Sequence, residues 1–334
     1  MLVMVDSYGA FVGKKSERLV IKQRDGTKEE KPLFDIEQIM ISSNGVSISG
    51  DAVRECMNRG VQIVFANHQG QPYGVLSGLE LNGTVKTRRA QLMAYHDQRG
   101  VNFAKEVARA KVQNQINTIK YFLKSRKEDE SLVAICETYI RAMQTAIRQI
   151  KKIDGDNIDA VREQIMAAEG HAGRSYWQAV SQLLPAELAF DQREHRGARN
   201  QVNMMLNYGY GILYSKAWQV IILAGLDPYG GFLHVDRPGK PSLVLDFVEE
   251  FRQAIVDRVV LASLLRGFRA RLEDDFLDQS TRRELAARIN ERLKATDRYE
   301  KKKMRLQNIM LSQARRLATF LRGEAEYKAH IGRW

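Results

Sequence analysis

A change in the pattern of apolar residues near position 80 divides this chain of 334 residues into two unequal parts. No proline occurs between Pro72 and Pro185, and apolar residues in that stretch recur at spacings of three and four, as in Val112, Ile116 and Ile119. This spacing places side chains on one face of an α-helix, and without proline the helical hydrogen bonds are uninterrupted. We therefore expect the larger, C-terminal part to be a set of packed helices.

The N-terminal part has short apolar runs separated by turn residues, which is typical of strands. Asp25-Gly26 favours a β-hairpin, because both residues tolerate positive φ. Ser49 can cap a short helix that runs through Cys56 and ends at Gly60. We expect strands over residues 2–5, 11–14, 18–23, 28–33, 37–42 and 61–66.

The predicted fold class is α+β: a small N-terminal antiparallel β domain followed by a larger all-α catalytic domain. The β domain covers residues 1–80, a linker covers 81–85, and the helical domain covers 86–334. Helices are expected over roughly 86–98, 101–126, 131–152, 157–169, 172–184, 198–225, 242–268, 279–294 and 296–322.

The overall charge indicates a polyanionic partner. Lysine and arginine number 52 against 40 acidic residues, which gives a net charge of +12. Acids are interspersed with the bases along the predicted helices, so the pattern is that of a folded, solvated protein and not of a basic tail. Nucleic acid is the natural candidate for such a partner.

Cysteine use and hydropathy predict a cytoplasmic protein without a membrane anchor. Cys56 and Cys136 lack CxxC spacing, which favours buried thiols in a reducing compartment over a zinc site. The N-terminus lacks a basic, signal-like region. The most apolar stretch, 202–226, contains Lys216 and Gln219, which indicates a core helix and not a membrane span.

Four polar residues form the candidate site: His234, Asp246, Glu249 and Glu169. One imidazole with two or three carboxylates is a ligand set for Mg²⁺ or Mn²⁺. Asp246 and Glu249 are three apart and share a helix face, with Ser242 as a plausible N-cap. The alternative is that both acids merely favour the helix N-terminus.

Glu169 precedes Gly170 and can be explained as the end of a helix. A carboxylate at a helix C-terminus faces the negative end of the dipole, so its placement calls for a compensating cation. A metal ion would supply one. Each of these signals is weak by itself, and their combination favours metal-assisted phosphodiester chemistry.

Several segments, in this order, resemble those of a known family. They are ISSNGVSIS at 41–49 with GVQIVF at 60–65, EG at 169–170 leading to RSYW at 174–177, NMMLNYGY at 203–210, and GFLH at 231–234 leading to LDFVEEFR at 245–252. Together they make the whole chain similar to the CRISPR-associated endonuclease/integrase, the core enzyme of spacer acquisition. Asn200 is a departure, because the family often has an aspartate there.

The resemblance implies a DNA enzyme with metal ligands at Glu169, His234 and Glu249 and an acidic partner at Asp246. Glu250 is disfavoured as a ligand, since it lies about 100° further round the helix. The implied reaction is attack by a DNA 3′-hydroxyl on a phosphodiester of the repeat array, or cleavage when water attacks. The implied partners are spacer-precursor DNA, the repeat array, a second copy of the chain joined through the β domains, and a small companion subunit between two dimers.

Basic and aromatic residues supply candidate DNA contacts, which would position DNA without reading its sequence. The basic residues cluster at Lys86, Arg88, Arg89, Lys105, Arg109 and Lys111, and again over 288–305. From these clusters and the segment 174–177 we single out Arg88, Arg89, Arg174, Tyr176, Lys301 and Lys302. For each run of basic residues the alternative is a solvated helix face, and for the aromatic residues it is a place in the core. Two other functions stay open: a non-catalytic nucleic-acid-binding scaffold, and a hydrolase that acts on RNA.

Overall fold

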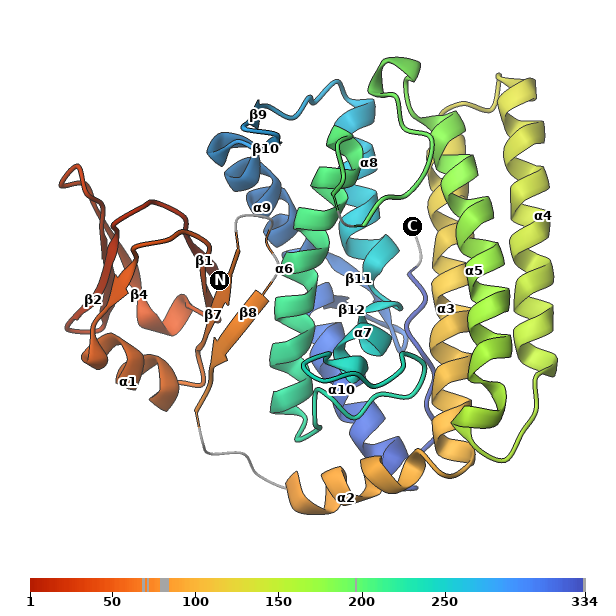
Figure 1. Ribbon diagram of the computed structural model, residues 1–334, viewed down its shortest axis with the longest axis horizontal. Coiled ribbons are helices and arrows are strands. Elements are labelled where there is room, and N and C mark those ends of the chain that lie inside the picture. Colours follow the sequence, from red (N-terminus) through yellow and green to blue (C-terminus); the bar gives the residue numbers. More distant parts are fainter. Residues whose placement is uncertain (68–69, 71, 79–83, 196, 333–334) are drawn as a thin grey trace.

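The computed structural model describes residues 1–67, 70, 72–78, 84–195 and 197–332. Two four-stranded sheets occupy the chain up to Leu76, and helices follow from Thr84 (Figure 1). This arrangement confirms the α+β class. Residues 81–83 of the expected linker lie outside the described residues, and its last two residues, Thr84 and Val85, begin the first helix of the helical part. The domain limits stay a prediction.

The β part is not purely antiparallel as predicted. The first sheet has the order β1-β5-β7-β8, and within it β1, β5 and β7 run parallel. The physical reason lies in the crossover connections, which return the chain in the same direction: helix α1 (Gly50–Asn58) lies between β5 and β7, and strands of the second sheet lie between β1 and β5. The strands are β1 (Leu2–Val5), β5 (Gln38–Ile41), β7 (Gln62–Ala66) and β8 (Pro72–Leu76).

The second sheet has the order β4-β3-β2-β6 and contains the predicted hairpin. Gly26 has φ +88° at the turn between β3 and β4. The Oγ of Ser49 accepts a hydrogen bond from Ala52 N at 3.2 Å, which confirms its predicted role as the cap of α1. The strands are β2 (Phe11–Lys15), β3 (Arg18–Lys22), β4 (Lys28–Pro32) and β6 (Ser47–Ile48).

The helical part contains α-helices joined by turns and by longer segments such as 184–200 and 224–241. The helices are α2 (Thr84–Ala94), α3 (Gln98–Leu123), α4 (Glu130–Lys152), α5 (Ile158–Leu183), α6 (Gln201–Leu223), α7 (Ser242–Val248), α8 (Arg258–Leu265), α9 (Gln279–Lys294) and α10 (Leu306–Leu321). A π-helical turn, Gln253–Asp257, precedes α8. Short 3-10 turns occur at Leu33–Asp35 and Ala186–Leu188.

Two small hairpins correct the prediction that this part is all-α. They are formed by β9 (Leu272–Glu273) with β10 (Phe276–Leu277) and by β11 (Thr296–Tyr299) with β12 (Lys302–Arg305). The second hairpin replaces the first turns of the helix expected over 296–322. At its tip Glu300 and Lys301 have φ of 45° and 71°, left-handed values that a helix cannot contain.

Helix boundaries near the candidate site also differ from expectation. The predicted break between 169 and 172 does not exist, because α5 is continuous from Ile158 to Leu183 and Glu169 lies in its interior. The helix expected over 242–268 is divided into α7, the π-helical turn and α8.

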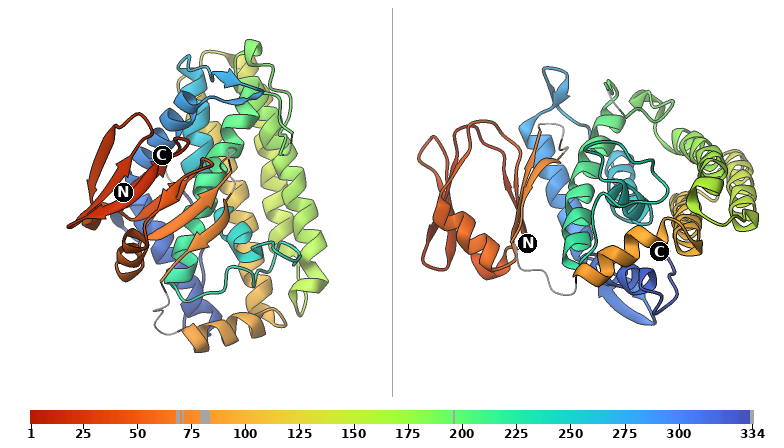
Figure 2. Two further views of the ribbon diagram at one scale, coloured as in Figure 1. Left: turned by 60° about the vertical axis from the view of Figure 1, so that its left-hand side comes forward. Right: turned by 60° about the horizontal axis from the view of Figure 1, so that its bottom comes forward.

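Helix α6 joins the two parts of the molecule. Figures 1 and 2 show the sheet with β7 and β8 facing α6 on one side, while α3, α4 and α5 lie beyond it on the other. Gly211 permits the close approach, since a Cβ there would lie 2.0 Å from the carbonyl oxygen of Gly70. Across the same contact Gln38 Nε2 donates to Ser215 O at 3.2 Å. Among the described residues no helix is both long and apolar enough to cross a membrane.

Candidate metal and nucleic-acid site

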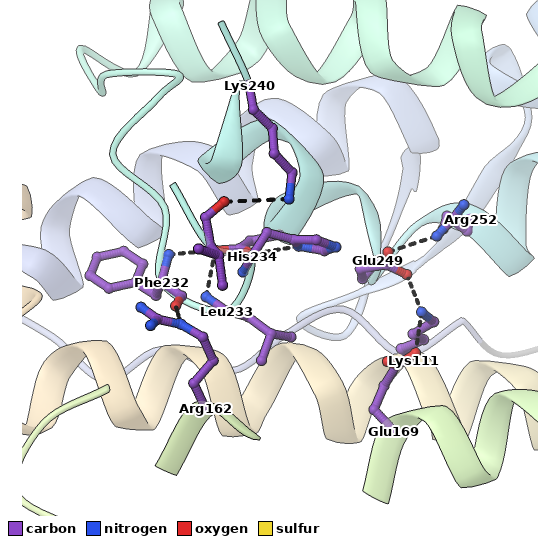
Figure 3. A network of polar contacts seen from close by, with 11 residues as sticks. Lys111, Arg162, Glu169, Phe232, Leu233, His234, Lys240, Glu249 and Arg252 are labelled. Carbon is purple, nitrogen blue, oxygen red and sulfur yellow. Dashed lines mark hydrogen bonds and ion pairs between the residues drawn. The ribbon is translucent and has the colours of Figure 1, made fainter. Parts of the chain in front are cut away.

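One pocket of about 300 Å³ brings the three predicted metal ligands together. Glu169, His234 and Glu249 all line it. Helices α3 and α5 form one side, and the chain on either side of α7 forms the other (Figure 3). The other lining residues are Lys111, Gln115, Gly173, Trp177, Arg193, His195, Tyr210, Arg252 and Gln253.

Asp246 does not line the pocket but holds the loop that carries His234. Its carboxylate is completely buried and accepts four hydrogen bonds. Oδ2 accepts from Phe232 N at 2.6 Å and Leu233 N at 3.0 Å. Oδ1 accepts from His234 N at 2.9 Å and lies 2.7 Å from His234 Nδ1.

The contact with Asp246 fixes the orientation of the His234 ring. A carboxylate can only accept, so Nδ1 carries the proton and donates it. In the neutral ring Nε2 is then left with its lone pair, and the ring extends towards Glu249 in Figure 3. A carboxylate behind an imidazole is the usual arrangement around a metal-bound histidine.

Close packing of Gly231 fixes the same loop against α7. A Cβ at Gly231 would lie 2.5 Å from both the carbonyl carbon and the Cβ of Ser242. Ser242 is not the N-cap that the sequence predicted: Pro241 holds that position, and no side chain caps the helix. The hydroxyl of Ser242 is instead buried against the loop.

Lys111 of α3 lies between the two carboxylates. Its Nζ forms an ion pair with Glu169 Oε1 and lies 2.7 Å from Glu249 Oε2 (Figure 3). Burial alone would lower the pKa of Lys111, but the charges of Glu169 and Glu249 outweigh it and raise that pKa. Glu169 lies in the interior of α5, so the prediction based on the helix dipole was wrong, but its carboxylate does have a cation beside it in Lys111.

Glu249 is held in its charged form by the surrounding cations. Burial would raise its pKa, but the charges of Arg252, Lys111 and His234 lower it to about 2. Arg252 Nη1 donates to Oε1 at 2.7 Å. The buried Oε2 lies 2.7 Å from Lys111 Nζ, so the ammonium is its partner.

Glu250 faces away from the pocket and anchors the C-terminal segment. Its carboxylate accepts from Tyr327 OH at 2.6 Å, from Gln313 Nε2 at 2.8 Å and from the backbone N–H of His330. The side chain is fully buried in this network. Glu250 therefore has no free oxygen to offer the pocket, and this supports Glu249 as the candidate ligand.

Cations and aromatic rings form the wall of the pocket beside Glu249. The guanidinium of Arg252 lies 4.2 Å from the centre of the Tyr210 ring, and that of Arg193 lies 5.4 Å from it. Burial, followed by the charges of Arg193, Arg252 and Lys111, lowers the pKa of His195 to about 4. His195 is therefore neutral at physiological pH, and the cations give the pocket a positive wall that suits phosphate.

Tyr176 cannot stack on a base as predicted. It is fully buried, and its hydroxyl donates to Asp257 Oδ2 at 2.8 Å. Trp177 lines the pocket instead, because Glu169, Gly173 and Trp177 follow at intervals of four and share one face of α5. The alternative that at least one of these aromatics belongs to the core is confirmed.

The other predicted DNA contacts do not line the pocket. Arg89, Arg174, Lys301 and Lys302 are exposed, and Arg88 is partly buried on α2. Arg174 Nη2 lies 2.6 Å from His171 Nδ1. Their contact with DNA stays a prediction.

Sequence reasoning missed most of the positive residues of the pocket. Lys111 was grouped with exposed basic residues, whereas its spacing of four from Gln115 places both on the face of α3 that lines the pocket. Arg252 follows Glu249 at a spacing of three, a signal for an ion pair on one helix face that was available. No local pattern singled out Arg193 or His195.

The donor set fits a hard divalent ion, although its geometry is not that of a finished coordination shell. Within the described residues no group of three or more His, Cys, Asp and Glu side chains is arranged to hold a metal ion. The ammonium of Lys111 pairs with both Glu169 and Glu249. Two carboxylates around one cation and the oriented His234 are the ligand types of Mg²⁺ and Mn²⁺ sites.

Comparison with known proteins identifies the family. A family model described as "CRISPR associated protein Cas1" matches residues 3–300. The chain belongs to the Cas1 family. A "CRISPR-associated endonuclease Cas1 1" from Archaeoglobus fulgidus is 36% identical over 100% of both chains.

Solved structures share the fold of this family member. A casposase bound to an integration product has a TM-score of 0.83 at 22% identity, over 98% of this chain and 92% of the other. A Cas6-RT-Cas1–Cas2 complex contains a chain with a TM-score of 0.80 at 17% identity, over 99% of this chain and 36% of the other. Asn200, where the family often has aspartate, still caps α6: its Oδ1 accepts from Val202 N at 2.8 Å.

Proposed function

We propose that this chain is a metal-dependent DNA endonuclease and integrase that inserts spacer DNA into a CRISPR repeat array. The observation that carries the proposal is the meeting of Glu169, Glu249 and an oriented His234 in one pocket with a positive wall. Membership of the Cas1 family and a full-length relative named as an endonuclease support it.

The proposed reaction is a transesterification at phosphorus. The 3′-hydroxyl oxygen of the incoming DNA bonds to phosphorus, the bond to a 3′ oxygen of the repeat strand breaks, and the proton lost by the attacking hydroxyl ends on the leaving oxygen. With water as the nucleophile the same steps cleave DNA. A divalent ion held by Glu169, His234 and Glu249 would supply charge neutralisation at the phosphodiester.

The chain's own residues prepare the site for this reaction. Asp246 holds His234 with its Nε2 lone pair available, and Arg252 holds the carboxylate of Glu249. Arg193 and Arg252, stacked on Tyr210, present positive charge to the phosphate that enters. These contacts would bind the backbone of DNA irrespective of its sequence.

The proposed partners are spacer-precursor DNA, the repeat array, a second copy of the chain and a small companion subunit. Support comes from the neighbours: one is a casposase bound to an integration product, and another is a Cas1–Cas2 complex. The net charge of +12 suits the DNA component. We expect Mg²⁺ or Mn²⁺ as the cofactor.

A strand-joining assay tests the proposal. The purified protein is incubated with labelled 3′-OH duplexes, a repeat-containing plasmid and Mn²⁺, with and without chelator. We expect joining and cleavage that the chelator stops and that His234→Ala and Glu249→Ala abolish, while the dimer persists in solution. Glu163→Gln is the matched control, because Glu163 is exposed on α5, the helix that carries Glu169.

Two outcomes of this assay would point to other functions. If the protein binds DNA but never joins or cuts it, the chain is a nucleic-acid-binding scaffold whose acids only stabilise the fold. If ribonucleotide strands are cut in preference to deoxyribonucleotide strands, the chain is an RNA hydrolase. Full activity of His234→Ala in Mn²⁺ would contradict the site assignment itself.

A further inference from the structure

Lys111 occupies the place that a metal ion would need. It lies in the interior of α3 with only 13% of its side chain exposed, and its two ion pairs are with Glu169 and Glu249. Its location excludes the solvated helix face that the sequence suggested for it. The two predicted carboxylate ligands therefore already share one cation.

The cationic side chains of the pocket outnumber its carboxylates even without a metal ion. Three cationic side chains, Lys111, Arg193 and Arg252, line the pocket together with two carboxylates, Glu169 and Glu249. A divalent ion added to this set would be repelled by the ammonium at close range, since charges a few ångströms apart interact strongly away from bulk water. Either the lysine leaves or the ion binds weakly.

We propose that Lys111 is the resident cation of the metal-free site, which holds Glu169 and Glu249 together and competes with the divalent ion for them. The inference rests on the proposed function, because it presupposes that the two carboxylates bind a metal ion. The inference adds that Lys111 sets the affinity of the site for the divalent ion, because the ion must displace its ammonium from the two carboxylates.

Lys111 is better suited to this exchange than its cationic neighbours. Arg252 is fixed by three contacts: it donates to Glu249 at 2.7 Å and to Tyr214 OH at 3.3 Å, and it stacks on Tyr210. Lys111 is a single ammonium on a flexible stem of four carbons, so it can withdraw without breaking a planar array of hydrogen bonds. Its ion pairs with both Glu169 and Glu249 stabilise the paired carboxylates whenever no metal ion is present.

The test compares Mn²⁺ binding to the full-length chain and to Lys111→Met, which removes the charge and keeps much of the volume. Free Mn²⁺ is measured by electron paramagnetic resonance during titration, and the melting temperature is recorded in chelator and in Mn²⁺. We expect Lys111→Met to bind Mn²⁺ at least tenfold more tightly than the unaltered chain. In chelator Lys111→Met should melt at a lower temperature than the unaltered chain. Adding Mn²⁺ should raise its melting temperature by more than that of the unaltered chain, because the ion then replaces the missing cation.

Two control variants separate local from general charge effects. Lys111→Arg keeps a cation between the carboxylates and should bind Mn²⁺ no more tightly than the unaltered chain. Lys120→Met removes the same charge from an exposed position of α3 and should change neither Mn²⁺ affinity nor the response of the melting temperature to Mn²⁺.

The inference and the proposed function fail in different ways. Equal or weaker Mn²⁺ binding by Lys111→Met would overturn the inference, and so would a variant that stays unfolded with and without Mn²⁺. If Glu249→Gln abolishes Mn²⁺ binding in that case, the metal site stands and only the role of Lys111 is wrong. If Glu249→Gln leaves Mn²⁺ binding unchanged, the proposed metal site itself is wrong.

Discussion

Replacing Asp246 by asparagine should destabilise the loop that carries His234, although aspartate and asparagine have nearly the same shape. Each carboxylate oxygen accepts two hydrogen bonds, from Phe232 N and Leu233 N on one side and from the backbone and ring nitrogens of His234 on the other. An amide presents one oxygen and one NH₂ group, so in either orientation its NH₂ faces two donors. With the His234 ring in its Nδ1–H tautomer, two of the four bonds are therefore lost.

The magnitude follows from the kind of bond that is lost. A hydrogen bond to a charged acceptor contributes about 1.5–3 kcal/mol, so two losses amount to about 3–6 kcal/mol before the loop relaxes. We expect a loss of unfolding free energy of at least about 3 kcal/mol in urea titrations. Metal affinity should fall by about 10–100-fold, as it does when the partner of a ligating histidine is removed.

Hydrogen–deuterium exchange gives a local measurement of the same change. In Asp246→Asn the amides of Phe232 and Leu233 should lose protection, while peptides from α4 keep theirs. Asp236→Asn is the matched control, because Asp236 is exposed in the same loop. Unchanged protection at 232–234 together with an unchanged urea midpoint would refute the argument that Asp246 holds the loop.

Three further predictions follow from the site and its surroundings. The pKa of Glu249 is lowered to about 2 in the folded chain from an ordinary value of 4.5, so its contribution to stability is complete above about pH 4.5 and is lost as the pH falls towards 2. Glu249→Gln should flatten that part of the curve of melting temperature against pH. Gly231→Ala should destabilise the fold by about 1–3 kcal/mol in urea, because its Cβ would meet the backbone of Ser242, whereas Gly170→Ala, which has open space, should not. DNA affinity measured by fluorescence anisotropy should fall steeply between 50 and 200 mM salt, and a flat response would exclude backbone phosphates as the main contacts.

The sequence by itself determined the features that depend on neighbouring residues. The spacing of apolar residues located α3, α4 and α6, since a helical period is a local property of the chain. The cap at Ser49 and the turn at Gly26 follow from single side chains and were predicted correctly. The motifs around Glu169, His234 and Glu249 indicated the family, and the structure brings these three residues to one pocket.

Only the tertiary structure decided how charges and strands meet across long stretches of chain. The parallel pairing of β1, β5 and β7 depends on which strands become neighbours, and local pattern does not encode this. The hairpin at β11 and β12 replaces a helix because two residues adopt left-handed backbone conformations in a stretch rich in helix-forming residues.

The partners of the buried charges were likewise beyond the reach of sequence patterns. In the sequence, nothing distinguishes Lys111 from the other basic residues. In the structure, α3, α5 and the chain after α7 pack together and place it between Glu169 and Glu249. The sequence predicted Asp246 only as an acidic partner of the ligands, and the folded loop shows that all four of its hydrogen bonds go to residues 232–234. A buried charge is stable only beside a compensating group, and packing determines which group that is.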